Sequence, residues 1–413
     1  TRGHIDSYNM MVVGKYFERV DDFCNAEMVN KKYAGMTRKY KCNPIPLNDE
    51  RTRRVFSGIE TQHLYSEGED VWKGDNIKRH VYWYPVSYGD SIEKRGEGDE
   101  YKCVKYTAGD RMRYGNEIPE CVNVISDECF CGHQSLLWIN IPSSVTEIGK
   151  ECFGDCTSLS SISIPSSVSV IGKGCFSKCR NLTNLIIDSN NVHYVVDNGI
   201  IFDKERNKIV EYIPSNRQTS YSIPSSVTEI GDGCFSGCTL LSSISIPSSV
   251  SIIKDGCFIG CISLRSISIP SSVSVIGNRC FKDCISLHPS FDIPSSVTEI
   301  GDYCFCSCRD LRSITIPSSV SVIGNVCFFW CEELSSTSIP SSVSVIGDAC
   351  FSLCKSLSSV TIPSSVSVIG KGCFSRCYAL SSISIPSSVS DIGDECFSDC
   401  NSMSSVKIGR AHV

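Results

Sequence analysis

The sequence predicts an α+β repeat fold, a solenoid of stacked units that follows a small helical module. Ile-Pro dipeptides recur from Pro119 to Pro386, mostly at a constant interval of twenty-three residues, as from Pro340 to Pro363. Each unit repeats eight apolar positions, too few to close a core without neighbouring units. Two cysteines four residues apart, with phenylalanine after the first, recur in ten units. These three observations predict a stacked array.

Residues 1–117 are predicted to form a separate N-terminal module. The segments 8–19 and 22–33 carry apolar residues at helical spacing and predict two short helices. The stretch 60–117 is rich in charged residues and predicts a linker with some strand. We interpret the module as a cap over the first coil's open apolar end. The helical hairpin also resembles an F-box-like segment, without the usual Leu-Pro opening, which implies recruitment of a ubiquitin-ligase scaffold.

The solenoid is predicted to occupy residues 118–413, with about twelve units that mostly keep this interval of twenty-three positions. Their pattern is I-P-S-S-V-[ST]-x-I-G-x-x-C-F-x-x-C-x-x-L-x-S-[IV]-x-I. The alternation in L-x-x-I-x-I predicts a short strand, and C-F-x-x-C-x-x-L predicts a short helical turn. One longer unit, 188–223, holds Asn198-Gly199 between "VVD" and "IIF", a hairpin signal. In "LHPSFDIP" one extra residue and Pro289 predict a bulge or break in the sheet.

The phrase LxxIxIPxxVxxIGxxCFxxCxx resembles the BspA-like leucine-rich repeats of surface-associated proteins of bacteria and protists. The resemblance covers residues 118–408 and departs from the family in one respect. This chain has cysteine before the phenylalanine, where the family usually has alanine. The resemblance implies a curved leucine-rich-repeat solenoid with a parallel β-sheet on its concave side. It also implies a peripheral cell-surface location and a role in adhesion.

The cysteines are predicted to form two columns, because equivalent residues of stacked coils lie about 4.8 Å apart. Disulfide Cβ atoms prefer about 3.8 Å, so bridges along a column would be strained. Zinc needs four converging ligands, which a continuous column does not offer. Reduced core thiols are the favoured interpretation, some disulfides a second, and a metal site the third. The metal alternative rests on one crowded cluster: Cys121, Cys129, Cys131 and His133.

The remaining composition gives no support for catalysis, nucleic-acid binding or membrane insertion. The formal net charge is −6, which argues against a basic nucleic-acid surface. No run of eighteen apolar residues occurs, and the N-terminal residues lack the apolar centre of a signal peptide. The seven histidines are scattered outside recognisable motifs. We therefore expect no enzyme activity, no catalytic residue and no cofactor.

Partner contacts are predicted at two places in the repeat. Outward strand positions are mostly serine or threonine, with Arg265 and Arg312 as exceptions. The turn "CFFWCEEL" places aromatic and acidic residues where other units have small ones, and exposed aromatics are candidate interface anchors. An alternative is that this coil packs its own aromatics. The candidate contacts at the turns are Phe329, Trp330, Glu332, Glu333, Arg376 and Tyr378.

The leading function is therefore non-enzymatic binding of a protein or extracellular-matrix ligand by the solenoid, including surface adhesion. The alternative is a cytoplasmic interaction scaffold or F-box-like ubiquitin-ligase adaptor that uses the N-terminal hairpin. Reduced thiols favour the inside of the cell, whereas the family resemblance favours its surface. The last unit, "SSVKIGRAHV", lacks a covering helix, so end-to-end self-association through the C-terminal coil is a further expectation.

Overall fold

The computed structural model describes residues 7–72, 76–213 and 218–409, with side chains from Met10 onward. Two compact units, Thr1–Ser126 and Asp127–Val413, divide the chain. The sequence analysis placed this boundary after residue 117. Within the described residues, no helix is long and apolar enough to cross a membrane.

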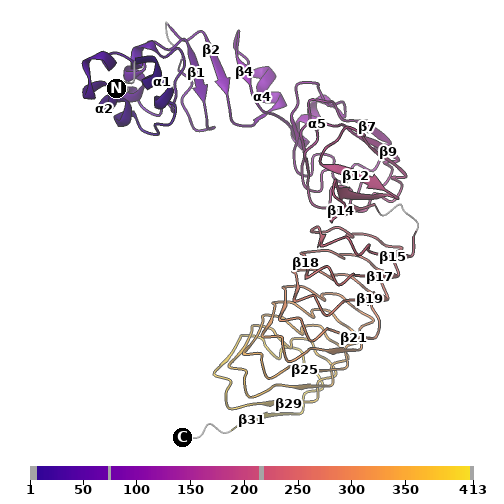
Figure 1. Cartoon of the computed structure of the whole chain (residues 1–413). Coiled ribbons are helices and arrows are strands. Elements are labelled where there is room, and N and C mark those ends of the chain that lie inside the picture. Colours follow the sequence, from indigo (N-terminus) through magenta and orange to yellow (C-terminus); the bar gives the residue numbers. More distant parts are fainter. Residues whose placement is uncertain (1–6, 73–75, 214–217, 410–413) are drawn as a thin grey trace. The chain divides into compact units, whose positions relative to one another are not determined.

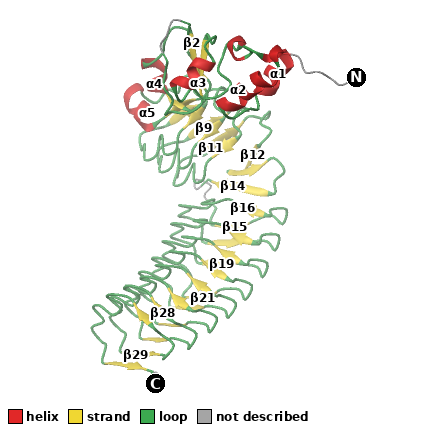
Figure 2. Ribbon diagram, turned by 90° about the vertical axis from the view of Figure 1, so that its left-hand side faces the viewer, coloured by secondary structure: helices red, strands yellow, loops and turns green. Residues whose placement is uncertain are grey.

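The first unit begins with a helical core built around Phe23. Its ring packs edge-on against Phe17 and Phe56, both 5.0 Å away between centroids, and against Tyr40 at 5.9 Å. Such edge-to-face contacts add specificity to apolar burial. Figure 2 shows these helices in red. The helices are α1 (Ser7–Gly14), α2 (Val20–Val29), η1 (Lys31–Tyr33), η2 (Thr37–Lys39) and α3 (Glu50–Val55).

The stretch predicted as a charged linker with some strand is more ordered than a linker, since it forms short coils with parallel strands. Strand pairing joins Thr61 with Arg79 in one sheet and Lys105 with Val124 in another, so these coils are shorter than the regular repeat. One sheet contains β1 (Thr61–Leu64), β2 (Arg79–Tyr82) and β4 (Glu100–Tyr101). The other parallel pairs join β3 (Val86–Ser87), β5 (Val104–Tyr106) and β6 (Val124–Ile125), and two helices intervene, α4 (Tyr88–Glu93) and α5 (Ala108–Tyr114).

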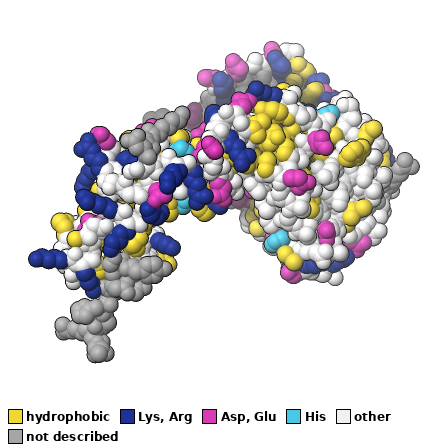
Figure 3. All heavy atoms as spheres, turned by 90° about the horizontal axis from the view of Figure 1, so that it is seen from above, with side chains coloured by type: hydrophobic (Ala, Val, Ile, Leu, Met, Phe, Trp, Pro, Cys, Tyr) yellow, Lys and Arg dark blue, Asp and Glu magenta, His cyan; other side chains and the backbone are white. Residues whose placement is uncertain are grey.

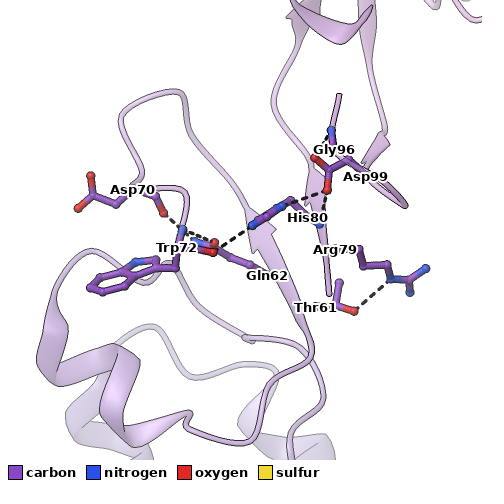
Figure 4. A network of polar contacts seen from close by, with 8 residues as sticks. All are labelled: Thr61, Gln62, Asp70, Trp72, Arg79, His80, Gly96 and Asp99. Carbon is purple, nitrogen blue, oxygen red and sulfur yellow. Dashed lines mark hydrogen bonds and ion pairs between the residues drawn. The ribbon is translucent and has the colours of Figure 1, made fainter. Parts of the chain in front are cut away.

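Polar side chains inside these coils explain why the linker prediction was wrong. Gln62 is fully buried; its amide donates to the Asp70 carbonyl at 2.8 Å and accepts from the Trp72 N–H at 2.9 Å. The His80 N–H donates to the buried Asp99 carboxylate at 2.8 Å, and the His80 ring Nδ1 lies 3.0 Å from the same oxygen. Figure 4 shows this network. The polar residues of this stretch therefore form hydrogen bonds inside the coils, whereas those of a linker would be solvated.

The second unit is a parallel-sheet β-solenoid in which each regular coil contributes two strands (Figures 1 and 2). Equivalent residues pair in register, for example Ile244 with Ile267. The sheets that carry the L-x-S-I-x-I strands are β7 (Trp138–Asn140), β9 (Ser161–Ile164) and β11 (Asn184–Ile187); β15 (Ser220–Ser222), β17 (Ser243–Ser245) and β19 (Ser266–Ser268); and β21 (Ser290–Asp292), β23 (Ser313–Thr315), β25 (Ser336–Ser338), β27 (Ser359–Thr361), β29 (Ser382–Ile385) and β31 (Ser405–Ile408).

The other strand of each coil is very short and follows the Ile-Pro-Ser-Ser corner. In Figure 1, β18 lies on the opposite side of the solenoid from β15, β17 and β19. These short strands are β8 (Glu147–Ile148), β10 (Val170–Ile171), β16 (Glu229–Ile230), β18 (Ile252–Ile253), β20 (Val275–Ile276), β22 (Glu299–Ile300), β24 (Val322–Ile323), β26 (Val345–Ile346), β28 (Val368–Ile369) and β30 (Asp391–Ile392).

The core is continuous from coil to coil. One buried cluster of valine, isoleucine, leucine, cysteine and phenylalanine side chains extends from Ile200 to Cys396. The phenylalanines stack along it: Phe374 lies 5.6 Å from Phe351 and 5.7 Å from Phe397, with nearly parallel rings. No single coil contains this core, because each ring is covered by the next coil's ring.

The predicted short helical turn is present as consecutive hydrogen-bonded turns. Cys377 N–H donates to the Phe374 carbonyl at 3.3 Å, and Leu380 N–H to the Cys377 carbonyl at 3.1 Å. Between them, Arg376 adopts φ +59°, a left-handed conformation that a right-handed helix cannot continue through. Within the described part of the chain, no helix follows Tyr114.

Both irregularities that the sequence predicts are confirmed. One parallel sheet ends at β19 and the next begins at β21, next to Pro289, which has no N–H to donate. The opposite sheet continues across this point, with Val275 paired to Glu299. In the long unit, β12 (Tyr194–Asp197) and β13 (Ile200–Asp203) form an antiparallel hairpin around Asn198-Gly199, and β14 (Lys208–Tyr212) follows. Both turn residues have positive φ, +49° and +74°.

Candidate binding surface

The strands of sheets β15–β19 and β21–β31 present two columns of hydroxyl groups to solvent. The central residue of each strand points into the core, and the residues on either side of it point to solvent. In-register pairing stacks these outward residues on their equivalents in the neighbouring coils. We call these the first and second hydroxyl columns. The first contains Ser220, Ser243, Ser266, Ser290, Ser313, Ser336, Ser359, Ser382 and Ser405. The second contains Ser222, Ser245, Ser268, Thr315, Ser338, Thr361 and Ser384, with Asp292 and Lys407 at equivalent positions.

Most other recurring serines bind the preceding coil. The second serine of the Ile-Pro-Ser-Ser corner donates to a valine carbonyl of that coil, as Ser272 does to Val250 at 2.7 Å and Ser365 to Val343 at 2.7 Å. The serine immediately before the strand also donates to a carbonyl of the preceding coil, as Ser358 does to the Ser335 carbonyl at 3.2 Å. These hydroxyls hold the coils in register.

The hydroxyls of the two columns differ from those of the corner serines, because no column hydroxyl has a hydrogen-bond partner among the described residues. In sheet β21–β31, nearly all of these side chains are exposed. Over β15, β17 and β19 the surface is hollowed, with a cavity volume of about 340 Å³ lined by column serines and Tyr221. An ordered face of unsatisfied hydroxyl groups can donate to and accept from an external partner.

Backbone conformation directs the candidate contact side chains at the turns outward. The residue before the second cysteine has positive φ in coil after coil, including Trp330 at +61° and Arg376 at +59°. Glycine occupies this position in some coils, for example Gly260 at +67°. A non-glycine side chain there is held outward at some conformational cost.

Trp330 lies in a cluster of charged side chains from three coils. The Arg309 guanidinium covers its ring at 4.1 Å, and its indole N–H donates to Glu332 at 2.6 Å. Lys355 also donates to Glu332, at 2.7 Å. Hydrogen bonds from Lys355 and then Trp330 hold the pKa of Glu332 below its usual value. The ring is therefore half-buried by its own neighbours, as the alternative interpretation expected.

The eight predicted contacts do not form one site. Glu333 approaches Arg312 at 3.9 Å, so both lie beside the Trp330 cluster. Arg376 instead pairs with Asp399 at 3.3 Å. Tyr378 is 38% exposed in a later coil. Phe329 is partly buried, and Arg265 is exposed two coils before Arg312, so their roles as partner contacts stay a prediction.

Sequence reasoning missed one polar cleft beside the long unit. It is lined by Lys173, Glu205 and Asp232, together with the hairpin residue Tyr194. Lys173 and Asp232 occupy a position that varies from unit to unit, and Tyr194 and Glu205 belong to the irregular unit, so the repeat pattern does not mark this combination. The available signal was the absence of C-F-x-x-C from residues 188–223, because a coil without this turn must interrupt the stack.

The fold and its repeating surface define a leucine-rich-repeat solenoid. A family model described as the BspA type leucine rich repeat region matches residues 115–204, 207–334 and 321–412. These matches cover more than half of the sequence, so the chain belongs to this family. No curated protein sequence matches the chain.

Solved structures of leucine-rich-repeat proteins are similar to the chain. A protein from Eubacterium ventriosum has a TM-score of 0.57 and 24% identity over 73% of this chain and 83% of its own, which shows the fold. A leucine rich cell surface protein from Faecalibacterium prausnitzii has 26% identity over 70% and 84%, with a TM-score of 0.41. A leucine-rich repeat protein from Bacteroides ovatus has 29% identity over 69% of this chain and 82% of its own, with a TM-score of 0.43.

Proposed function

We propose that the solenoid binds an extracellular-matrix protein at a cell surface, without catalysis, through its two hydroxyl columns. The observation that supports this is the division of the serines. Those at corners and immediately before the strands bind the preceding coil, whereas those on the strand face have no partner among the described residues. Membership of a family with surface-associated members supports the location. Within the described residues, no group of three or more His, Cys, Asp or Glu side chains could hold a metal ion.

The test places arginines on the proposed face of the whole protein and measures binding to immobilised basement-membrane extract. Ser338→Arg with Thr361→Arg puts bulk and charge into the second column on consecutive coils, where both residues are exposed. We expect binding to weaken about tenfold or more, because the arginines clash with a seated partner.

The matched control carries the same charges on the opposite sheet. Val322→Arg with Val345→Arg uses side chains that are 53% and 47% exposed there, and should leave binding within about twofold. An equal loss of binding in both double variants, or no binding by the unmodified protein, would contradict matrix adhesion through this face.

The turn residues are proposed as secondary contacts beside this face. The free edge of Tyr378 makes it a better anchor than Trp330, whose ring is already covered by Arg309. Glu333 and Arg312 lie at the junction of turn and strand face, where a partner on the columns would reach them. Self-association is proposed at β31, where Val406 and Ile408 are 46% and 70% exposed.

A cytoplasmic scaffold or adaptor is the second candidate function. Its support is a set of exposed apolar side chains in the helical part of the first unit, with Tyr16, Met28 and Val29 exposed by 84%, 76% and 78%. Figure 3 shows Lys and Arg side chains frequent around this helical part. An exposed apolar face with a charged rim is typical of a protein-docking surface.

A further inference from the structure

The long unit leaves an edge inside the solenoid. In a regular coil the short strand after β10 would pass near Tyr194, one repeat interval beyond Ile171. Tyr194 instead starts the antiparallel hairpin β12–β13. Its hydroxyl donates to the Ser169 carbonyl at 3.0 Å and accepts from the Ile171 N–H at 3.3 Å. One side chain therefore satisfies the edge of β10 where a strand would otherwise lie.

A cleft opens between β10 and the coil of β14 and β16. Its volume is about 420 Å³, within the range of small-molecule sites. Ile171 and Val210 contribute apolar surface, and Val192, 69% exposed, lies at the rim. Lys173 extends from the wall across the next coil, since a Cβ on Gly233 would lie 3.3 Å from its Cε and a Cβ on Gly256, one coil further, would lie 3.8 Å from its Nζ.

The cleft contains charges that the protein leaves unpaired. Lys208, also in the lining, is paired with Glu229 at 2.8 Å. The side chains of Lys173, Glu205 and Asp232, by contrast, have no ion-pair or hydrogen-bond partner among the described residues.

Asp232 is notable because its equivalents in later coils bind the following coil. The Asp255 carboxylate accepts the Asn278 N–H at 2.8 Å, and the Asp348 carboxylate accepts the Lys371 N–H at 2.7 Å. The Asp232 carboxylate makes no such bond to a described residue and lines the cleft instead. Asp232 is thus available to a ligand, whereas its equivalents Asp255 and Asp348 are used to join neighbouring coils.

We propose that this cleft binds a neutral sugar unit. The lining carries three carboxylates, on Asp203, Glu205 and Asp232, and two ammonium groups, on Lys173 and Lys208, so a free anion and a free cation would each meet like charge. A neutral polyhydroxylated ligand can donate to the carboxylates and accept from the ammonium groups, and such charge-assisted hydrogen bonds are strong. Its C–H faces can contact Val192 and Val210. This site is separate from the hydroxyl columns and goes beyond the function proposed for them.

The test is saturation-transfer NMR on the whole protein with glucose, galactose, mannose and N-acetylglucosamine as separate probes. We expect at least one sugar to bind, and Asp232→Asn to weaken that sugar about tenfold or more, since one charge-assisted hydrogen bond is lost. Glu205→Gln should weaken it as well. Asp394→Asn is the matched control, an exposed residue at the same repeat position outside the cleft, and should leave the affinity within about twofold.

Phosphate and glycine serve as anionic and zwitterionic probes. Binding of either in preference to all four sugars would overturn the assignment, as would the absence of any sugar signal. A sugar signal that both cleft variants leave unchanged would place the ligand elsewhere. The strand-face variant Ser338→Arg with Thr361→Arg should keep full sugar binding, so failure of matrix adhesion and failure of this site give different results.

Discussion

The thiol of the second cysteine in most regular units donates to a phenylalanine carbonyl of the preceding coil. The Sγ–O distance is 3.0 Å from Cys179 to Phe153 and 3.2 Å from Cys377 to Phe351. Alanine would fill part of the space but leave that carbonyl without this donor. Burial raises the pKa of the Cys350 thiol to about 12. Cysteine therefore acts here as a small core residue with one weak donor.

Phe374→Ala should destabilise the solenoid by about 3–5 kcal/mol, because it leaves a cavity between two stacked rings. Its side chain is fully buried between Phe351 and Phe397. Urea unfolding followed by circular dichroism measures the change. Ser382→Ala in the next strand removes a hydroxyl without a partner among the described residues and should change stability by less than about 0.5 kcal/mol. Equal midpoints for the two variants would contradict a core role for the ring.

At the scale of elements, β14 replaces the missing turn of the long unit. Tyr212 takes the place of phenylalanine: its N–H donates to the Cys234 carbonyl at 2.9 Å, and its ring lies 5.1 Å from Phe235. Glu211 takes the place of cysteine and is buried. Burial raises its pKa well above the ordinary value, although hydrogen bonds from backbone groups of Phe176 and Gly174 act in the opposite direction.

The raised pKa of Glu211 predicts a stability that falls as pH rises. Above pH about 4.5, the ordinary pKa, the unfolded chain releases the proton that the folded state still holds, so each rise in pH favours unfolding. Glu211→Gln does not titrate and should lose this slope. Urea midpoints at pH 5 and pH 8 should therefore converge for the variant and differ more for the unmodified protein.

Glu229→Gln is the control for this pH dependence. Hydrogen bonds from Lys208 and Lys254 lower the pKa of Glu229, so it is ionised in both states across the same window. Its replacement should shift both midpoints equally and leave the slope intact. A slope that survives Glu211→Gln would mean that another group causes it.

The elements show what the sequence could predict. Repeats with a recurring Ile-Pro corner fix the coil and its buried face, and Asn198-Gly199 and Pro289 mark two departures correctly because both act through local backbone geometry. The coils in 61–117 were missed because their shorter interval carries no such corner and their interior uses residues such as Gln62. The cleft was missed because it exists only where two unlike coils meet.

At the scale of the molecule, the core that extends from Ile200 to Cys396 makes the redox state of its cysteines a shared property of these coils. All 27 are free thiols, and 21 of them are buried. Burial protects the buried thiols from oxidants while the array is folded, and it raises the pKa of thiols such as Cys354 and Cys373 well above the ordinary value. A surface-exposed solenoid must therefore complete folding before its thiols meet an oxidising environment, whereas a cytoplasmic one faces no such constraint.

Thiol counting on protein purified from its own cells without reductant tests this state. Alkylation before and after denaturation, read by mass spectrometry, should label few cysteines in the native protein and nearly all of them after unfolding. The first to react should be the less buried ones, such as Cys24 and Cys121, because the columns open only when coils separate. Bridges found between column cysteines would contradict the reduced core, since a bridge would break the bonds from Sγ to the phenylalanine carbonyls. Reduced thiols in protein recovered from the cell exterior would show that the core forms before export, while their recovery only from the cell interior would favour the scaffold over the adhesin.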